Sequence, residues 1–186
     1  MSKCDSGRGS VSEESVLQGV RAPKPQGTAL AVPPVPPMKM VLLAWLGGVV
    51  AISAVAGFGM LASTPLVLGS FGATCVLVFG YPDSPFSQPR NVVLGHLFSS
   101  FIGLAVLTLF GPQWWAAGLA VGTAIAVMML TRTVHPPAGS NPVIVFLSQP
   151  GWDFLLFPTL IGSVIVALVA LIYGNLEKPH HSPASR

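Results

Sequence analysis

The most informative segment of the chain is residues 131–146, which read Thr-Arg-Thr-Val-His-Pro-Pro-Ala-Gly-Ser-Asn-Pro-Val-Ile-Val-Phe. It places a polar, proline-interrupted segment inside an otherwise apolar chain. Hydrocarbon tolerates non-helical backbone only where that backbone is buried in protein or faces a watery cavity. Ionisable groups at membrane depth are costly, so Arg132 and His135 beside the break favour a functional segment. The alternative is a connecting loop at the membrane surface, where both side chains are simply solvated.

The composition of the chain is that of an integral membrane protein. Apolar residues make up 52% and charged residues only 8% of the 186 residues, and the mean hydropathy is +0.71. Soluble domains carry about 25% charged residues. Between positions 41 and 173 the charged residues are Asp83, Arg90, Arg132 and Asp153. The uncharged intervals are long enough to cross a lipid bilayer, so the sequence predicts an all-α, polytopic membrane helix bundle.

Polar tails flank the membrane domain that we place at residues 40–174. Ser, Gly, Pro and charged residues dominate residues 1–39, which are predicted to form a disordered cytoplasmic tail. Residues 175–186 form a second polar tail. Acidic residues within the first 39 positions argue against an organelle transit peptide.

Several kinds of site are disfavoured by where the reactive residues lie. Basic residues are concentrated in the N-terminal tail, without a basic stripe or interleaved aromatics, which argues against nucleic acid. Cys4 and Cys75 lack metal-ligand spacing, so neither a metal nor another cofactor is predicted. The apolar runs contain no carboxylate, and no nucleophile or phosphate-loop motif is present, so the chain is not expected to be an enzyme.

Six apolar segments follow one another between the tails. They are residues 40–62, 66–79, 91–110, 114–130, 136–148 and 154–173. The second and fifth are short, begin near proline and carry Gly-Ser pairs. If all six cross with the N-terminus in the cytoplasm, every Lys and Arg falls on the cytoplasmic side. The positive-inside rule therefore favours six crossings with both termini cytoplasmic. We expect the membrane to be the plasma (inner) membrane of a bacterium.

This topology divides the chain into two sets of three segments, 40–110 and 114–173. Each set has a long span, a short broken segment and another long span. Because three is odd, the halves have opposite orientations, which is the inverted-repeat pattern of transporters with a site near the bilayer midplane. The internal sequence match is limited to a few residues, and chance similarity is the competing explanation.

The fifth segment supplies the main candidate binding residues. Pro136 and Pro137 suit a helix start, and the residues from Ala138 to Asn141 would then expose backbone amides to a small anion. The predicted substrate-binding positions there are His135, Pro136, Pro137, Gly139, Ser140 and Asn141. Gly69, Ser70 and Thr74 of the second segment are expected to complete the surface. Close helix packing is the alternative role for these small residues.

Ionisable side chains supply the remaining candidates. A histidine side chain can titrate near neutrality, so His135 is a candidate for carrying a coupling proton; its alternative role is a helix cap. His96 lies inside the third segment and could pair with His135 or serve in packing. Arg132 and Arg90 are candidate anion contacts, with interfacial anchoring as the alternative.

Three blocks of this sequence resemble the HPP family of integral membrane proteins. They are His135-Pro136-Pro137-Ala138-Gly139 with Thr133 and Asn141-Pro142, the stretch Gly69–Ala73, and the stretch Gln88–His96. The family is usually described with four transmembrane helices, so the two short segments are where our count differs. Plant and cyanobacterial members are associated with nitrite transport, and the resemblance implies that activity here.

The sequence thus predicts a transporter or channel for a small inorganic anion, with nitrite as the leading candidate. The alternative from another class is a non-transporting membrane scaffold or subunit that packs against a partner membrane protein. The expected partners are the lipid bilayer and the anion; a homo-oligomer is compatible with the sequence. A scaffold should tolerate the loss of His135, whereas a transporter should not.

Overall fold

The computed structural model describes residues 34–177, with side chains to Gly174. The predicted tails therefore lie almost entirely outside the described residues. The helices are α2 (Met38–Leu61), α3 (Gly69–Gly80), α4 (Pro89–Phe110), α5 (Trp114–Leu130), α6 (Asn141–Ser148) and α7 (Ile161–Glu177). Short irregular turns lie between them: η1 (Pro85–Ser87), η2 (Pro136–Ser140), η3 (Trp152–Leu155) and η4 (Leu156–Leu160). This part of the chain contains no strand.

The predicted helical membrane bundle is confirmed. Helices α2 and α4 and the segment Trp152–Gly174 are long and apolar enough to cross a bilayer, and α3 and α5 are shorter apolar helices. Large apolar side chains cover their outer faces, including Leu61, Trp114 and Leu130, each more than 80% exposed. In a bilayer, lipid covers such surfaces, so their exposure costs nothing.

The fifth segment is broken, as the prolines predict. Residues Pro136–Ser140 form the tight turn η2, and the regular helix α6 begins only at Asn141. Pro142 sits in the first turn of α6, where a missing N–H is not needed. Residues 136–148 therefore rise only about 20 Å, which is less than the roughly 30 Å hydrocarbon thickness.

The structure corrects the second and sixth segments. Helix α3 begins at Gly69 rather than at residue 66, because the chain entering it is extended up to Leu68 (φ −105°, ψ 144°). The sixth segment is interrupted at Phe157, which has extended dihedral angles (φ −126°, ψ 115°). Phe157 precedes Pro158, and a proline ring disfavours the helical conformation of the residue before it. The last segment is therefore also broken near its start.

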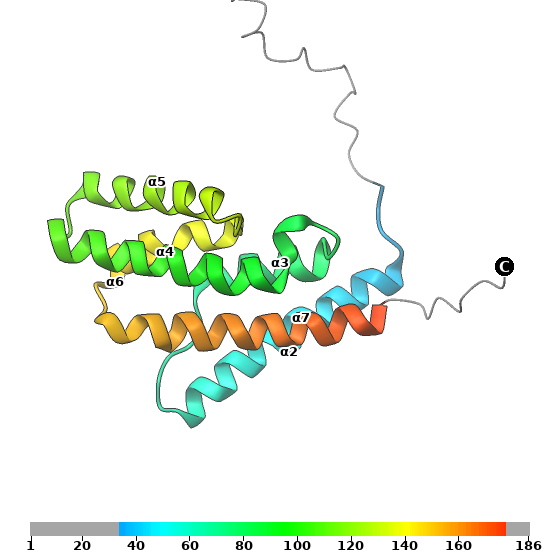
Figure 1. The fold of residues 1–186 in the computed structure, drawn as a ribbon. Coiled ribbons are helices and arrows are strands. Elements are labelled where there is room, and N and C mark those ends of the chain that lie inside the picture. Colours follow the sequence, from blue (N-terminus) through cyan, green and yellow to red (C-terminus); the bar gives the residue numbers. More distant parts are fainter. Residues whose placement is uncertain (1–33, 178–186) are drawn as a thin grey trace, which may run out of the picture. The chain divides into compact units, whose positions relative to one another are not determined.

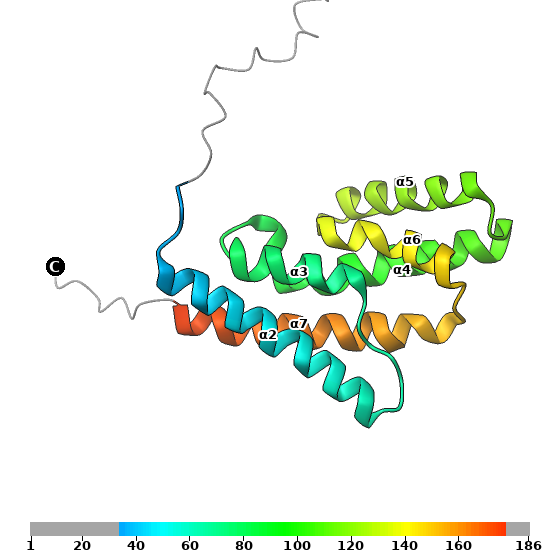
Figure 2. The same cartoon turned by 180° about the vertical axis from the view of Figure 1, so that it is seen from behind.

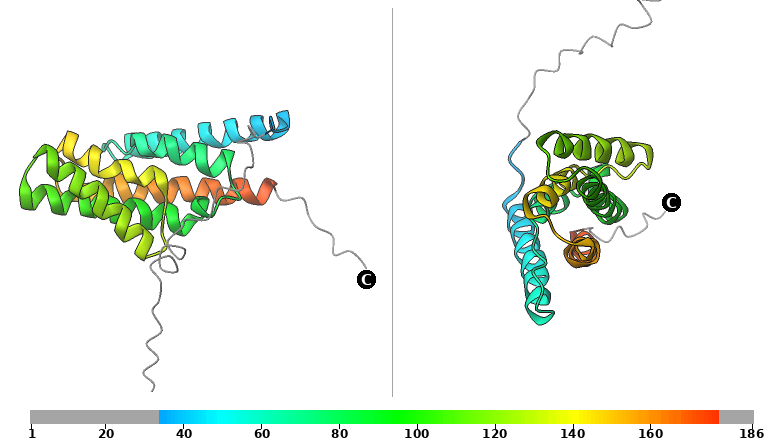
Figure 3. Two further views of the ribbon diagram at one scale, coloured as in Figure 1. Left: turned by 90° about the horizontal axis from the view of Figure 1, so that it is seen from above. Right: turned by 90° about the vertical axis from the view of Figure 1, so that its left-hand side faces the viewer.

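Within the part from Pro36 onward, α4 has the most neighbours. It packs against α5, α6 and α7, as the end-on view in Figure 3 shows. Helix α2 crosses α7 at an angle and also packs against α3 (Figures 1 and 2). The short helix α3 reaches η2, so the two short segments meet inside the bundle.

The packing of the segments supports the predicted inverted repeat. In the two halves, α2 corresponds to α5, α3 to η2 with α6, and α4 to α7. Exchanging the halves therefore converts the contact of α2 with α3 into that of α5 with α6. It converts the contact of α4 with α5 into that of α7 with α2, and the contact of α4 with α6 into that of α7 with α3. The contacts of α4 with α7 and of α3 with η2 map onto themselves. All five types of contact are present, as a two-fold relation requires.

The connections alternate between the two ends of this helical part. The connections at 62–68, 111–113 and 149–151 lie toward one end in Figure 1, and those at 81–88 and 131–135 lie toward the other. The start of α2 and the end of α7 lie on the second side (Figures 1 and 2). This alternation is what six passages require; which end is cytoplasmic stays a prediction.

Candidate functional site

Two histidines and a threonine from three different segments form the centre of the site. Oγ of Thr74 in α3 lies 3.0 Å from Nε2 of His96 in α4. The same oxygen lies 2.9 Å from Nε2 of His135, the residue just before η2. All three residues are fully buried. The ring centroids of the histidines are 5.2 Å apart, so the threonine hydroxyl bridges them.

The cluster continues deeper into the bundle through amide and hydroxyl groups. Nδ2 of Asn141, at the start of α6, lies 3.1 Å from Nδ1 of His96. The same amide nitrogen donates to Oγ of Ser100 at 2.8 Å. Ser100 is hydrogen-bonded to Thr159 of η4 at 3.0 Å. The buried polar side chains named here thus form one continuous series of contacts.

We call this series the polar file. Its members, in spatial order, are the Phe86 carbonyl, His135, Thr74, His96, Asn141, Ser100 and Thr159. Nδ1 of His135 lies 2.9 Å from the Phe86 carbonyl in the 81–88 connection, at the end of the bundle. Ser100 lies about 16 Å along α4 from its first residue, roughly half of that helix. The polar file therefore runs from one end of the bundle to its middle.

The acceptors in the file determine which ring nitrogens carry hydrogen. A carbonyl oxygen only accepts, so Nδ1 of His135 donates to Phe86. The amide nitrogen of Asn141 also lies 3.3 Å from the His96 carbonyl, an oxygen that can only accept, and this contact assigns it as the donor side of the amide. Its two hydrogens then serve the Ser100 hydroxyl and the two acceptors of His96, and the amide oxygen is left buried without a partner among the described residues. Nδ1 of His96 therefore accepts from Asn141, and its hydrogen sits on Nε2, facing Thr74. These assignments follow from the hydrogen-bond network.

A glycine allows α4 to pack directly on His135. A Cβ atom built on Gly95 would lie 2.8 Å from Cβ of His135 and 3.1 Å from the carbonyl oxygen of Thr133. Contacts between Cβ atoms are not that short, so any side chain at this position would push the two segments apart. The absence of a side chain at Gly95 thus helps to hold the two imidazoles at the distance that Thr74 bridges.

Comparison with known proteins identifies the family. The family model described as "HPP, transmembrane region" matches residues 33–183. The chain belongs to the HPP family. Two relatives from Dictyostelium discoideum are named only as transmembrane proteins. The first is 31% identical over 163 residues, covering 81% of this chain and 57% of the relative. The second is 38% identical over 128 residues, covering 64% of this chain and 41% of the relative.

The HPP chain therefore spans about half the length of these curated relatives. No solved structure matches it. The resemblance expected from the sequence motifs is confirmed, and with it the assignment to multi-pass integral membrane proteins.

The structure brings five of the predicted site residues of this HPP protein together. His135, His96, Thr74 and Asn141 belong to the polar file, and Ser70 adjoins it through its carbonyl oxygen, which accepts from Thr74 at 3.0 Å. Ser70 is 2% exposed, and its side-chain oxygen has no hydrogen-bond partner among the described residues. Thus the two short segments of the HPP fold meet at polar groups, but through Thr74 and His135 rather than through their Gly-Ser pairs.

Other predicted site residues lie apart from the file. Ser140 is exposed and donates to the carbonyl of Pro137, so it does not face Ser70. Gly69 and Pro136 are exposed, and Pro137 and Gly139 are half-buried. The two arginines, Arg90 and Arg132, are exposed near the end of the bundle. Arg90 donates to the carbonyl of Thr131 at 3.1 Å.

The expectation of four free amides after Pro137 is wrong for two of them. The amide of Ala138 donates to the His135 carbonyl at 3.0 Å. The amide of Asn141 donates to the Ala138 carbonyl. The prolines favour a tight turn in which each amide reaches back three residues, so these donors are satisfied within η2. The side chains of the HPP motif, rather than its amides, supply the buried polar groups.

Thr159, Ser100 and the Phe86 carbonyl belong to the polar file but are not among the site residues predicted from the sequence. Pro158 was the available signal for Thr159, because a proline inside an apolar segment marks a break where a polar group can be turned inward. No comparable signal marks Phe86, because its contribution is a main-chain carbonyl, which every residue has.

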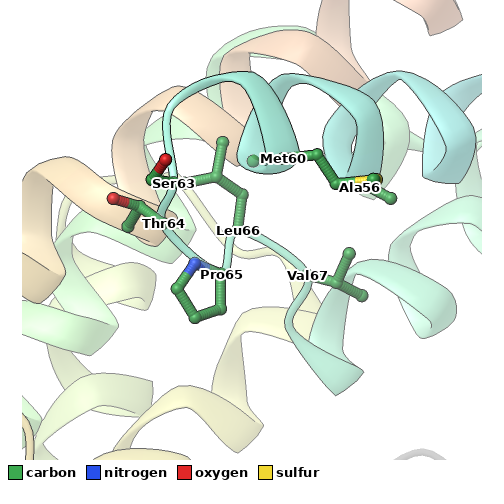
Figure 4. Close-up of a pocket in the computed structure, with 8 residues that line it drawn as sticks. Ala56, Met60, Ser63, Thr64, Pro65, Leu66 and Val67 are labelled. Atoms are coloured by element: carbon green, nitrogen blue, oxygen red, sulfur yellow. The ribbon is translucent and has the colours of Figure 1, made fainter.

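Two grooves on the surface lie outside the polar file. One, of about 350 Å³, lies where α2 ends and the chain turns toward α3, and Figure 4 shows the residues that line it, from Ala56 to Val67. None of the predicted site residues lines it. The second, of about 410 Å³, is lined by residues of α3 and by Tyr81, Pro136 and Pro137. Its lining includes Ala73 and Pro136, the chain neighbours of Thr74 and His135.

Proposed function

We propose that this HPP protein carries a small inorganic anion across the membrane, with nitrite as the first candidate substrate. The observation that carries the proposal is the polar file, a fully buried set of hydrogen-bonding side chains where the two short segments meet. Buried polar groups inside a membrane bundle are costly and usually line a pathway or site. A carrier, rather than an enzyme, is the role that these groups fit.

The chemistry of the site favours an anion over a cation. Its side chains offer N–H and O–H donors: Nε2 of His96, the hydroxyls of Ser70 and Thr74, and the amide of Asn141. The acidic side chains described outside the tails, Asp83 and Asp153, are both exposed. A buried site with several donors and no carboxylate stabilises negative charge, because charge-assisted hydrogen bonds to an anion are stronger than neutral ones.

The broken segments support movement as well as binding. Each half of the bundle contains one short segment, and the two short segments meet at the hydrogen bond between Thr74 and His135. Transporters built from inverted repeats place their sites at such interrupted segments and open them by moving one repeat against the other. The file is closed to solvent in the described conformation, so passage of the anion requires α3 and η2 to separate.

Nitrite and the cellular setting rest on the family resemblance and on charge. Nitrite transport is associated with plant and cyanobacterial members of the family. The positive-inside rule supports cytoplasmic termini, and we place the protein in the plasma (inner) membrane of a bacterium. The HPP chain covers about half the length of its curated relatives. What the rest of such a longer protein would add to transport belongs to the same proposal.

Uptake of nitrite into liposomes containing the purified protein tests the function. We expect uptake well above that of protein-free liposomes, because at neutral pH almost all nitrite is the ionised form, which crosses lipid slowly. His135→Ala should abolish the protein-dependent part, since it removes a buried member of the polar file. Equal uptake by protein-free, parent and variant liposomes would refute transport.

A non-transporting scaffold is the second candidate. Gly118 and Gly122 lie four residues apart on an exposed face of α5, and neither has a neighbouring atom within 4 Å of a Cβ built there. Small residues at this spacing let another membrane helix approach closely. If His135→Ala left the biological role intact while bulky residues at Gly118 abolished it, the scaffold would replace the carrier.

A further inference from the structure

The hydroxyl of Thr74 has three hydrogen-bond partners but only one hydrogen. Its oxygen lies 3.0 Å from Nε2 of His96, 2.9 Å from Nε2 of His135 and 3.0 Å from the Ser70 carbonyl. The carbonyl can only accept, so the threonine hydrogen is used when that bond forms. Both ring nitrogens must then donate to the two lone pairs of the Thr74 oxygen.

That arrangement fixes the charge of each imidazole. Nδ1 of His135 already donates to the Phe86 carbonyl, so donation from Nε2 as well means that His135 carries both hydrogens and a positive charge. His96 differs, because its Nδ1 accepts from the amide of Asn141 and only its Nε2 carries hydrogen. The full set of contacts is therefore satisfied by a protonated His135 beside a neutral His96.

The same heavy-atom positions also accommodate a neutral His135. Without the extra proton, Nε2 of His135 is a lone pair, and the Thr74 hydroxyl turns from the Ser70 carbonyl to donate to it. His96 continues to donate to Thr74 in both states. One hydroxyl rotation therefore adapts the site to either protonation state, without the movement of a heavy atom.

We propose that His135 binds one proton for each monovalent anion that the protein carries, with Thr74 as the hydroxyl switch and His96 as a neutral donor. This inference rests on the anion transport proposed above, and it names the coupling ion and the stoichiometry. In the binding step, a hydronium ion from the open side gives its proton to the Nε2 lone pair of His135 and leaves as water. The anion enters with it, so no net charge crosses.

The surroundings of His135 supply no negative charge to balance that proton. The titratable or charged side chains on the elements packed around it are Cys75 in α3, Tyr81 and Asp83 in the 81–88 connection, Arg90 and His96 in α4, and Arg132 in the connection from α5. Asp83 is exposed at the end of the bundle, and α5 and α6 contribute none. A bound anion therefore stabilises protonated His135, and by linkage the proton strengthens anion binding equally.

Liposomes that contain the purified protein and a trapped pH indicator test the coupling. Nitrite is supplied outside at defined pH, with potassium and valinomycin setting the membrane potential, and protein-free liposomes measure the passage of nitrous acid. We expect one proton to enter per nitrite and the protein-dependent rate to be independent of membrane potential. If the parent moves nitrite without protons, or with a rate that follows the potential, the coupling is refuted and transport stands. If the parent moves no nitrite, both proposals fail.

Variants separate the roles of the three residues. His135→Gln and Thr74→Val should each lower proton-linked nitrite uptake at least tenfold, and Thr74→Ser should restore it because it keeps the hydroxyl. His96→Gln keeps a neutral donor and should retain the pH dependence that His135→Gln loses.

Thr108→Val is the matched control, since the Thr108 hydroxyl bonds only the Leu104 carbonyl among described partners. Equal loss of pH dependence in His96→Gln and His135→Gln would overturn the assignment.

A spectroscopic measurement on the parent protein does not depend on the folding of variants. Solid-state NMR of protein labelled with ¹⁵N-histidine and ¹³C-carbonyl phenylalanine identifies His135 by its contact with Phe86. In saturating nitrite, we expect both nitrogens of that ring to carry hydrogen while the other buried histidine stays neutral. A His135 ring with a single N–H in saturating nitrite, throughout the pH range of transport, would refute the proposal.

Discussion

Nε2 of His135 lies 2.9 Å from Oγ of Thr74, and this hydrogen bond joins the two short segments of the bundle. The residues are 61 positions apart in the chain. Each belongs to a different half of the inverted repeat, so the bond crosses the interface between the halves. Any movement of one half against the other must break or remake this contact, which places the polar file at the interface that transport would open.

The first prediction concerns which end of the bundle is cytoplasmic. In a background with Cys4→Ser and Cys75→Ala, Asp83→Cys should be protected from a membrane-impermeant thiol reagent added outside intact cells. Gln113→Cys should react, because six crossings place residues 111–113 outside. Both positions are exposed in the bundle, so accessibility differs only through the membrane. External labelling at Asp83→Cys would overturn the proposed orientation.

The second prediction tests the contact between the short segments. Ala73 and Pro136 line the same groove, one residue away from Thr74 and His135 respectively. A cysteine pair at these positions should be joined by a short bifunctional thiol reagent in membranes, as detected by altered gel mobility after cleavage of the chain between them. A pair at Ala73 and Leu109 is the control, since Leu109 lies near the far end of α4. Joining of the control pair alone would contradict the fold.

The third prediction concerns the close approach at Gly95. Gly95→Ala places a methyl group 2.8 Å from Cβ of His135, so we expect it to destabilise the protein by about 1–3 kcal/mol, the usual cost of overpacking. Gly72→Ala in α3 is the matched control, because a Cβ there meets no atom within 4 Å. Thermal unfolding in detergent measures both. The close packing is disproved if the two variants unfold at the same temperature.

The fourth prediction compares two partners in the polar file. Ser100 is bonded to both Asn141 and Thr159, whereas among the described contacts the Thr159 side chain bonds only Ser100. Ser100→Ala should therefore cost more stability than Thr159→Val. Hydrogen bonds between membrane helices average about 0.6 kcal/mol and reach about 1.7 kcal/mol.

A double-mutant cycle of Ser100→Ala and Thr159→Val measures this coupling by chemical unfolding. We expect an interaction free energy of about 0.6 kcal/mol or more, because the two hydroxyls are 3.0 Å apart. Thr108→Val combined with Ser100→Ala is the additive control, since no contact joins those two side chains in the structure. Strict additivity in the test pair would mean that the Ser100–Thr159 bond contributes nothing.

Much of the helical fold could be predicted from the sequence because hydrocarbon imposes a strong constraint. Long uncharged runs must be helical in a bilayer, and the predicted bounds of α4 and α5 differ from the observed ones by at most two residues. Pro136, Pro137 and Pro142 marked the break in the fifth segment. The break at Phe157 was missed because a single proline inside an otherwise apolar run was read as part of a regular span.

The candidate site was predicted only in part. His96, His135, Thr74, Asn141 and Ser70 were named because polar or small residues in apolar segments require an explanation. A pairing of His96 with His135 was one of two roles considered for His96, but the bridge that Thr74 forms between them was not predicted, because the three residues come from three separate segments. Ser140 was grouped with Ser70 on the strength of a repeated Gly-Ser pair, yet it points away, since the tight turn of η2 directs its hydroxyl back to Pro137.

Composition and residue order are enough to indicate a helical membrane protein, the break in its fifth segment, and the polar residues that are out of place in an apolar setting. These properties follow from local composition, because the bilayer penalises each unpaired polar group wherever it lies in the chain. The bridge that Thr74 forms between His96 and His135 depends instead on how the segments pack. The same is true of the contacts with Asn141 and Phe86 that assign different hydrogens to the two rings. Hydrogen bonds depend on distances and angles between segments, and those are set by how the helices pack rather than by the order of residues within any one of them.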